Sequence, residues 1–287
     1  MTYLDIDTLF ISGGGLNCLS ILGSLKYMMI NGFIDNKLDI FKNIIGVSGG
    51  VIHILPILLG YTIDEAINFF MKININDYLN NKISINSILN NYGIYDINVL
   101  KNIAKIMLKH KNYDENLTLA DLHKITKKNI LFKTINITKE QVIFIDHINY
   151  PDLTLSTAIC MTCCAPIMFI PIKYKGDLYI DGGYCGNFPF DIEHKYKKYI
   201  GLNIMCNDLQ YNTLNNKHNN HKINSISDYL RLLYRIFGIQ VRRENKRIIN
   251  INIYESGLDF KKQNNHKKKI INEGYNQTHN YFKSLIV

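Results

Sequence analysis

Several signals that would assign a function class are missing from this chain of 287 residues. The first residues, Met1–Asp5, lack the basic stretch and apolar core of a secretory signal, so we expect no signal peptide. Two long apolar runs, Ile44–Gly60 and Leu155–Ile172, contain Pro56 and Pro166, and we expect core elements there rather than a transmembrane helix. The sequence therefore predicts a protein in the cytoplasm or at the periphery of a membrane.

Signals for nucleotides and metals are also missing. The triple glycine Gly13–Gly15 is followed by Cys18, where a dinucleotide fingerprint needs glycine, and the Gly-Lys-Ser/Thr of a P-loop is absent. Cys160 and Cys163 have C-x-x-C spacing, but no second ligand pair answers them, which argues against a zinc site. We expect no metal and no cofactor, and we expect the cysteines to be buried free thiols.

Tryptophan is absent, yet apolar material is ample. The chain is 47% hydrophobic and 20% charged, as folded globular proteins are. Its net charge of +9 is concentrated in the last third, at Arg242, Arg243, Lys246, Arg247 and residues 267–269. No nucleic-acid motif accompanies these residues, so we expect no nucleic-acid partner and favour an anionic membrane surface, with a solvated face as the alternative. No repeat or linker divides the chain.

One short stretch, Gly46–Gly50, has the pattern G-x-S-x-G with Ser48 in the middle. It follows a strand expected at Asn43–Val47 and precedes a helix expected at Gly49–Gly60. In that context the pattern predicts a nucleophile elbow, in which small neighbours leave the serine hydroxyl exposed at a helix N-terminus. The helix dipole there favours developing negative charge. The alternative is a glycine-rich turn whose serine has no chemical role.

The triple glycine Gly13–Gly15 lies between an expected strand, Thr8–Ser12, and an expected helix, Leu19–Gly32. Backbone N–H groups can approach a ligand closely at such a corner because no Cβ blocks them. One interpretation is an oxyanion hole for a tetrahedral intermediate formed at Ser48. The alternative is a tight turn.

A third motif begins at Asp181. Residues Lys173–Ile180 are expected to form a hairpin, and this hairpin leads directly into Asp181-Gly182-Gly183. A carboxylate at a strand end lies where active sites of α/β proteins gather. The alternative is an aspartate that begins a turn, which is the commonest use of this residue at such a place.

The rest of the chain is expected to alternate between helices and strands, which predicts an α/β protein. A capping box between Thr62 and Glu65 should begin one helix. Further helices are expected at Leu117–Lys128, Thr154–Cys164, Ile226–Val241 and Asn264–Leu285. Strands are expected at Asn129–Thr138, Gln141–Asp146, Tyr199–Met205 and Ile248–Tyr254, and a mobile loop at Asn207–Asn224.

The three motifs, in this order and spacing, make the chain resemble the patatin-like phospholipase family. They are S-G-G-G at Ser12–Gly15, G-V-S-G-G at Gly46–Gly50 and D-G-G at Asp181–Gly183. Surrounding segments are similar too, so the resemblance covers nearly the whole chain. These segments are Leu58–Thr62, Ala158–Pro171, Asn187–Pro189 and Asn272–Tyr275.

The resemblance implies a three-layer α/β/α fold with a central, mostly parallel sheet, in a single domain over residues 1–287. It implies a lipid acyl hydrolase of the phospholipase A type that cleaves fatty-acyl esters of phospholipids through an acyl-enzyme. The nucleophile would be Ser48 and the base Asp181, with no metal or cofactor. The implied oxyanion hole consists of the amides of Gly13, Gly14 and Gly15, and the further motif positions are Gly46, Gly50, Gly182 and Gly183.

One departure and two alternatives accompany this interpretation. Asn17 and Cys18 stand where the family usually has a basic residue followed by glycine, which removes a charge-assisted contact to phosphate but leaves the amides. The first alternative is a Ser-Asp-His esterase that uses a later histidine, such as His194 or His221. The second is a non-catalytic or activator-dependent lipid-binding protein on the same scaffold. The sequence leaves open the headgroup, the acyl position, phospholipid against neutral glyceride, and the oligomeric state.

Overall fold

Apolar, β-branched runs form the centre of one eight-stranded sheet in the computed structural model of the protein. The structure describes residues 5–74, 88, 90–206, 245–254, 257 and 264–285. The loop expected at Asn207–Asn224 and the amphipathic helix expected at Ile226–Val241 lie outside these residues.

The strand order is β10-β9-β1-β2-β4-β8-β7, with β5 also paired to β4. The strands are β1 (Thr8–Ile11), β2 (Asn43–Val47), β4 (Asn129–Asn136), β5 (Gln141–Ile145), β7 (Ile172–Tyr174), β8 (Asp177–Asp181), β9 (Tyr199–Cys206) and β10 (Ile248–Ile253). Neighbours from β10 to β4 are parallel, while β5, β8 and β7 join antiparallel. This is the central, mostly parallel sheet that was expected.

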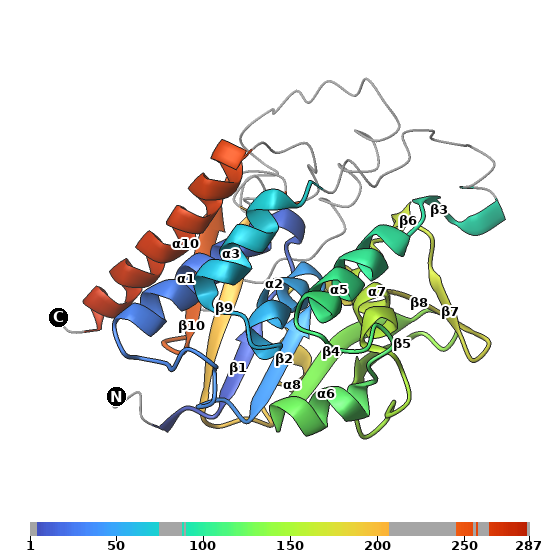
Figure 1. Ribbon diagram of the computed structural model, residues 1–287, viewed down its shortest axis with the longest axis horizontal. Coiled ribbons are helices and arrows are strands. Elements are labelled where there is room, and N and C mark those ends of the chain that lie inside the picture. Colours follow the sequence, from blue (N-terminus) through green and yellow to red (C-terminus); the bar gives the residue numbers. More distant parts are fainter. Residues whose placement is uncertain are drawn as a thin grey trace, which may run out of the picture.

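Helices cover the two faces of this sheet unequally. Figure 1 shows α1, α2, α3 and α5 in front of the strands and α8 behind them. The helices are α1 (Leu19–Ile30), α2 (Gly49–Leu58), α3 (Ile63–Lys72), α5 (Asn98–His110), α6 (Leu119–Thr126), α7 (Leu155–Cys163), α8 (Phe190–Glu193) and α10 (Asn264–Ser284). Single 3₁₀ turns, η2 (Gly15–Cys18) and η4 (Gly182–Cys185), follow β1 and β8.

Alternation along β1 shows how the two faces are filled, because successive side chains of a strand point to opposite sides. Leu9 and Ile11 belong to the large core cluster that α1 and α2 share. Phe10 instead joins a smaller cluster with Phe188 and Ile192, next to and within α8. The described residues thus form three layers, and the fold expectation is confirmed.

Helices α1 and α10 lie side by side (Figure 1). They are so close that only glycine fits at the contact. A Cβ on Gly23 of α1 would lie 1.9 Å from the carbonyl oxygen of Ile271, and one on Gly274 of α10 would lie 1.9 Å from that of Ser20. The Ser24 hydroxyl donates to the Gly274 carbonyl at 3.2 Å. We call this interface the α1–α10 contact.

Most expected elements are present, with ends shifted by a residue or two. The capping box at Thr62 and Glu65 is confirmed. Two short strands, β3 (Gly93–Tyr95) and β6 (Ile167–Phe169), were not expected, and they form a separate two-stranded sheet. Among the described helices, none combines the length and the apolar character that crossing a bilayer requires. The single domain over residues 1–287 stays a prediction.

Candidate active site

Strand β4 lies between the two halves of the candidate site. Its pairing with β2 places Lys133 beside Val47, the residue before Ser48. Its pairing with β8 places Thr134 beside Asp181. Two consecutive residues of β4 therefore set the separation of Ser48 and Asp181, which are far apart in the sequence.

Ser48 occupies the sharp turn between β2 and α2. Its backbone has φ 50° and ψ −135°, in the left-handed half of the map that L-residues rarely adopt. The turn packs directly onto the end of β1, since a Cβ on Gly50 would lie 2.3 Å from the carbonyl oxygen of Ser12. This is the strained strand-to-helix geometry of a nucleophile elbow, with the serine at the N-cap of α2.

The hydroxyl of Ser48 donates a hydrogen bond of 2.6 Å to Oδ2 of Asp181. The other carboxylate oxygen, Oδ1, accepts the amide of Gly183 at 2.7 Å. Asp181 is 2% exposed and Ser48 is 8% exposed. Burial raises the pKa of Asp181 to about 6, although the Ser48 hydroxyl, the Gly183 amide and the Lys133 charge each lower it. A carboxylate with such a pKa can both accept and return a proton near neutral pH.

Residues at the C-terminal end of α7 form hydrogen bonds with the backbones of Ser48 and Asp181. The hydroxyl of Thr162 accepts the backbone N–H of Ser48 at 3.0 Å and donates to the Lys133 carbonyl at 2.5 Å. Two residues later, the carbonyl of Cys164 accepts the backbone N–H of Asp181 at 3.0 Å. Sequence reasoning missed Thr162 and Lys133, because one lies in an apolar helix and the other in an ordinary strand pattern.

The triple glycine packs against the elbow. A Cβ on Gly13 would lie 3.1 Å from the Cβ of Ser48, and one on Gly49 would lie 3.2 Å from the backbone nitrogen of Gly15. The amide of Gly13 donates to the Asn187 carbonyl at 2.8 Å, so the fold itself uses this donor. The amides of Gly14 and Gly15 have no acceptor among the described residues. Of the three expected oxyanion donors, these two are the ones left available.

Gly257, which lies between β10 and α10 in the sequence, packs against the triple glycine. The amide of Leu16 donates to the Gly257 carbonyl at 2.8 Å. A Cβ on Gly257 would lie 2.0 Å from the Gly14 carbonyl oxygen and 3.4 Å from Nδ2 of Asn17. Asn17 itself is fully buried. The departure at Asn17 therefore changes the inside of this corner, where an uncharged amide packs under Gly257.

No described histidine forms a hydrogen bond with Ser48 or Asp181. His53 in α2 is buried, binds the Gly49 carbonyl through Nδ1 at 2.6 Å, and stacks on Phe70. Burial lowers the pKa of His53 to about 4, so this ring is neutral. His194 is exposed after α8, and His221 lies outside the described residues. The described geometry contains a serine–aspartate pair without a third member.

The clustered cysteines are buried in the core. Cys18, Cys160, Cys163 and Cys164 are buried free thiols, while Cys185 is an exposed one. Burial raises the pKa of Cys160 to about 12 and raises those of Cys163 and Cys164 well above their ordinary value, so these thiols stay protonated. Over the described ranges, no three His, Cys, Asp or Glu side chains are grouped as metal ligands would be.

Comparison with known proteins finds a matching family and related viral sequences. The family model described as "Patatin-like phospholipase" matches residues 9–194. The "Uncharacterized protein R571" of Acanthamoeba polyphaga mimivirus is 26% identical over 200 residues, which cover 69% of this chain and 65% of that protein. The "Probable lipid hydrolase 463L" of invertebrate iridescent virus 6 is 30% identical over 191 residues, or 66% of this chain and 63% of that protein. The chain thus spans slightly less than two thirds of these relatives.

Solved structures share the fold at low sequence identity. The crystal structure of VipD from Legionella pneumophila superposes with a TM-score of 0.60 and 15% identity, over 98% of this chain and 67% of VipD. The type III effector protein ExoU superposes with a TM-score of 0.51 and 12% identity, over 98% of this chain and 53% of ExoU. Both superpositions extend well beyond residue 194, across the last strands and the closing helix.

Proposed function

Because this chain belongs to the patatin-like phospholipase family, we propose that it is a lipid acyl hydrolase in which Ser48 is the nucleophile and Asp181 the general base. The observation that carries this proposal is the 2.6 Å hydrogen bond between the Ser48 hydroxyl and the Asp181 carboxylate. A nucleophile in direct contact with its base needs no intervening histidine to lose its proton.

The first half of the reaction forms an acyl-enzyme. The Ser48 oxygen attacks the ester carbonyl carbon while its proton passes to Oδ2 of Asp181. The negative oxygen of the tetrahedral intermediate is bound by the amides of Gly14 and Gly15, aided by the N-terminal dipole of α2. When the carbon–oxygen bond of the ester breaks, the leaving alcohol takes the proton back from Asp181.

The second half of the reaction restores the enzyme. Water attacks the acyl carbon and gives one proton to Asp181, and the fatty acid leaves as the Ser48 oxygen recovers that proton. The same two amides stabilise this second intermediate. The pKa of about 6 suits Asp181 to both roles, because a group that acts first as a base and then as an acid works best when its pKa lies near the ambient pH.

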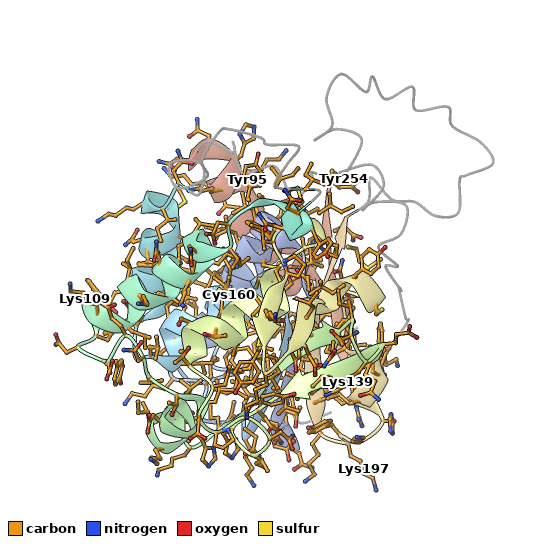
Figure 2. All side chains as sticks on the ribbon, turned by 90° about the vertical axis from the view of Figure 1, so that its right-hand side faces the viewer. Tyr95, Lys109, Lys139, Cys160, Lys197 and Tyr254 are labelled. Atoms are coloured by element: carbon orange, nitrogen blue, oxygen red, sulfur yellow. The ribbon has the colours of Figure 1, made fainter. Side chains whose placement is uncertain are left out.

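The substrate we propose is the fatty-acyl ester of a phospholipid at a membrane surface. The family description and the lipid hydrolase named among the relatives support an acyl lipid. An exposed tyrosine, Tyr184, directly follows Asp181-Gly182-Gly183, and Tyr254 directly follows β10. Figure 2 shows Tyr254 and Tyr95 at one end of the molecule and Lys197 at the other. Tyrosine side chains are favoured where an apolar phase meets water.

The test is to incubate the purified protein with mixed phospholipid vesicles in the presence of a chelator and to quantify free fatty acid and lysophospholipid. We expect release from the wild type and a loss of about 10³-fold or more in Ser48→Ala and Asp181→Asn. Asp177→Asn, at the start of the same strand, is the matched control and should keep its activity. Vesicle binding without any release would contradict the proposal and favour a lipid-binding protein.

A further inference from the structure

A lysine with no access to solvent lies beside the candidate site. Three lysines are buried in the described part of the chain, and Lys133 is the one with zero exposure. Its ammonium group contacts the carbonyl oxygens of Cys185 and Gly186 at 3.0 Å each and a carboxylate oxygen of Asp191 at 2.7 Å. Three acceptors thus match the three hydrogens of the ammonium group.

Two of the three acceptors of Lys133 belong to the loop that directly follows Asp181, and the third, Asp191, lies in α8. Residues 182–186 leave the end of β8, and Lys133 holds the far end of this segment through two carbonyls. The near end rests on the backbone of the same lysine, since a Cβ on Gly182 would lie 2.3 Å from the Lys133 carbonyl oxygen. Lys133 therefore contacts both ends of the loop whose Gly183 amide binds Asp181.

The charges around Asp181 are few. Ser48 contacts it from the elbow, Lys133 approaches from β4, and the thiols of Cys163 and Cys164 approach from the end of α7. Both thiols stay protonated because burial raises their pKa. Among the described residues, Lys133 is the positive charge that lowers the pKa of Asp181. Its partner Asp191 is 40% exposed, so solvent screens that partner more than the lysine.

We propose that Lys133 is a positioning residue for Asp181: it ties the loop after Asp181 to β4 and supplies the positive charge that favours the carboxylate form. This inference rests on the proposed function, in which Asp181 must be ionised to accept the proton of Ser48. A buried lysine is costly to keep in a core unless it is fully paired, and a hydrophobic residue would fill the same space more cheaply. Its contacts with Cys185, Gly186 and Asp191 explain why a lysine occupies this position.

A second buried lysine provides a matched control at the other end of β4. The ammonium group of Lys128 contacts a carboxylate oxygen of Asp39 at 3.2 Å and the Phe41 carbonyl at 3.3 Å. This lysine directly precedes β4, at the opposite end of the strand from the loop after Asp181. It shares the chemistry of Lys133, a buried cation with carbonyl and carboxylate partners, but its partners are Asp39 and Phe41 rather than the loop after Asp181.

The test measures the rate at which a fluorophosphonate reagent modifies the active serine, as a function of pH, in the wild type, Lys133→Met, Lys133→Gln, Lys133→Arg and Lys128→Met. The rate should rise with pH as Asp181 ionises. Removing the positive charge raises the pKa of Asp181, so this rise should move about one pH unit upward in Lys133→Met and Lys133→Gln. Gln keeps a hydrogen-bond donor, which separates loss of charge from loss of the contact. Lys133→Arg and Lys128→Met should match the wild type.

Each outcome of the test decides a different statement. A wild type that the reagent does not modify contradicts the proposed function itself. A modified wild type with an unmoved pH profile in a folded neutral variant overturns the role of Lys133 alone. If neither neutral variant folds, the variant Asp191→Asn tests the role of Lys133 instead. Removing this exposed carboxylate leaves the Lys133 charge less compensated, so the pH profile should move to lower pH. An unmoved profile in Asp191→Asn then overturns the proposal.

Discussion

The elbow and the α1–α10 contact are both places where two backbones touch because glycine leaves room. At the elbow, Gly50 lies against the Ser12 carbonyl, and at the α1–α10 contact Gly274 lies against the Ser20 carbonyl. The surroundings differ. The elbow includes a left-handed residue, Ser48, with φ 50°, while Gly23 and Gly274 have no positive φ. Close approach alone is a packing device, and at the elbow it also holds a residue with a strained backbone.

The hydroxyl groups in the two regions differ in the same way. Near the elbow, the buried hydroxyl of Thr162 has both a donor and an acceptor. In α10, the buried hydroxyl of Thr278 has no partner among the described residues. The backbone N–H of Ser48 and its hydroxyl both have partners, whereas α10 tolerates an unsatisfied hydroxyl. Strain at the elbow needs such support, because a strained backbone persists only when its surroundings fix it.

The largest expected contrast comes from adding one methyl group in each region. Gly50→Ala should reduce activity per folded molecule by about 100-fold or more, since it displaces Ser48. Gly274→Ala should leave that activity unchanged and lower the free energy of unfolding by about 1–3 kcal/mol through overpacking. Denaturant unfolding and active-serine titration measure the two quantities. Equal activity losses in both variants would break the comparison.

The next effect concerns the buried carboxylate. The pKa of Asp181 is about 6 in the fold against an ordinary 3.8, so the folded protein binds more protons than the unfolded chain between these values. Its stabilising contribution is present below about pH 4 and is lost as pH rises through 6, at a cost of about 3 kcal/mol. Asp181→Asn should therefore be more stable than the wild type at pH 7, with a difference that shrinks toward pH 4. A constant difference in melts across this range would contradict the assignment.

A smaller effect is expected at Thr162. Thr162→Val leaves the Ser48 amide and the Lys133 carbonyl unpaired, and we expect a loss of about 10- to 100-fold in kcat with little change in KM. Thr162→Ser keeps the hydroxyl and should restore the rate. If Val and Ser variants had equal activity, the hydroxyl would have no part in placing Ser48.

The smallest effect is expected at Thr278 in α10 and has the opposite sign. Thr278→Val removes a buried hydroxyl that has no partner among the described residues, so the free energy of unfolding should rise by about 1 kcal/mol. Activity should not change. Denaturation midpoints of the two proteins are sufficient to measure this difference, and a destabilised Thr278→Val would mean that the hydroxyl is satisfied in solution.

The sequence predicted much of this fold because most of its elements carry local signals. Glycine spacing around Ser48 predicted the turn, and β-branched runs predicted β1 and β2. The short strands β3 and β6 carry no such signal, since each exists only by pairing with the other. Local pattern also failed for the supporting residues. Lys133 resembles a solvent-facing strand residue until the register of β4 with β2 and β8 places it inside.

The site residues also differ in whether the neighbouring sequence marks them. Ser48 directly follows β2, Asp181 ends β8, and both precede glycines, so their neighbourhood in the sequence marks them. Their roles remain predictions for the experiments above. Thr162 is marked by nothing nearby, because its partners come from the elbow and from β4. The amide of Gly13 was expected to face the substrate, but Asn187 takes it through a contact between distant segments. Contacts between segments that are distant in the sequence therefore determine the surroundings of Ser48, and local sequence patterns do not reveal them.

The carbonyl of Gly257 behind the triple glycine has a consequence for the order in which the protein is made. A ribosome adds Ser48 early, yet β9, which flanks β1, comes about 150 residues later, and Gly257 later still. Until then β1 is an open edge and Leu16 lacks its acceptor. The glycine corner is therefore completed only after residue 257 has been added, more than 200 residues after the elbow.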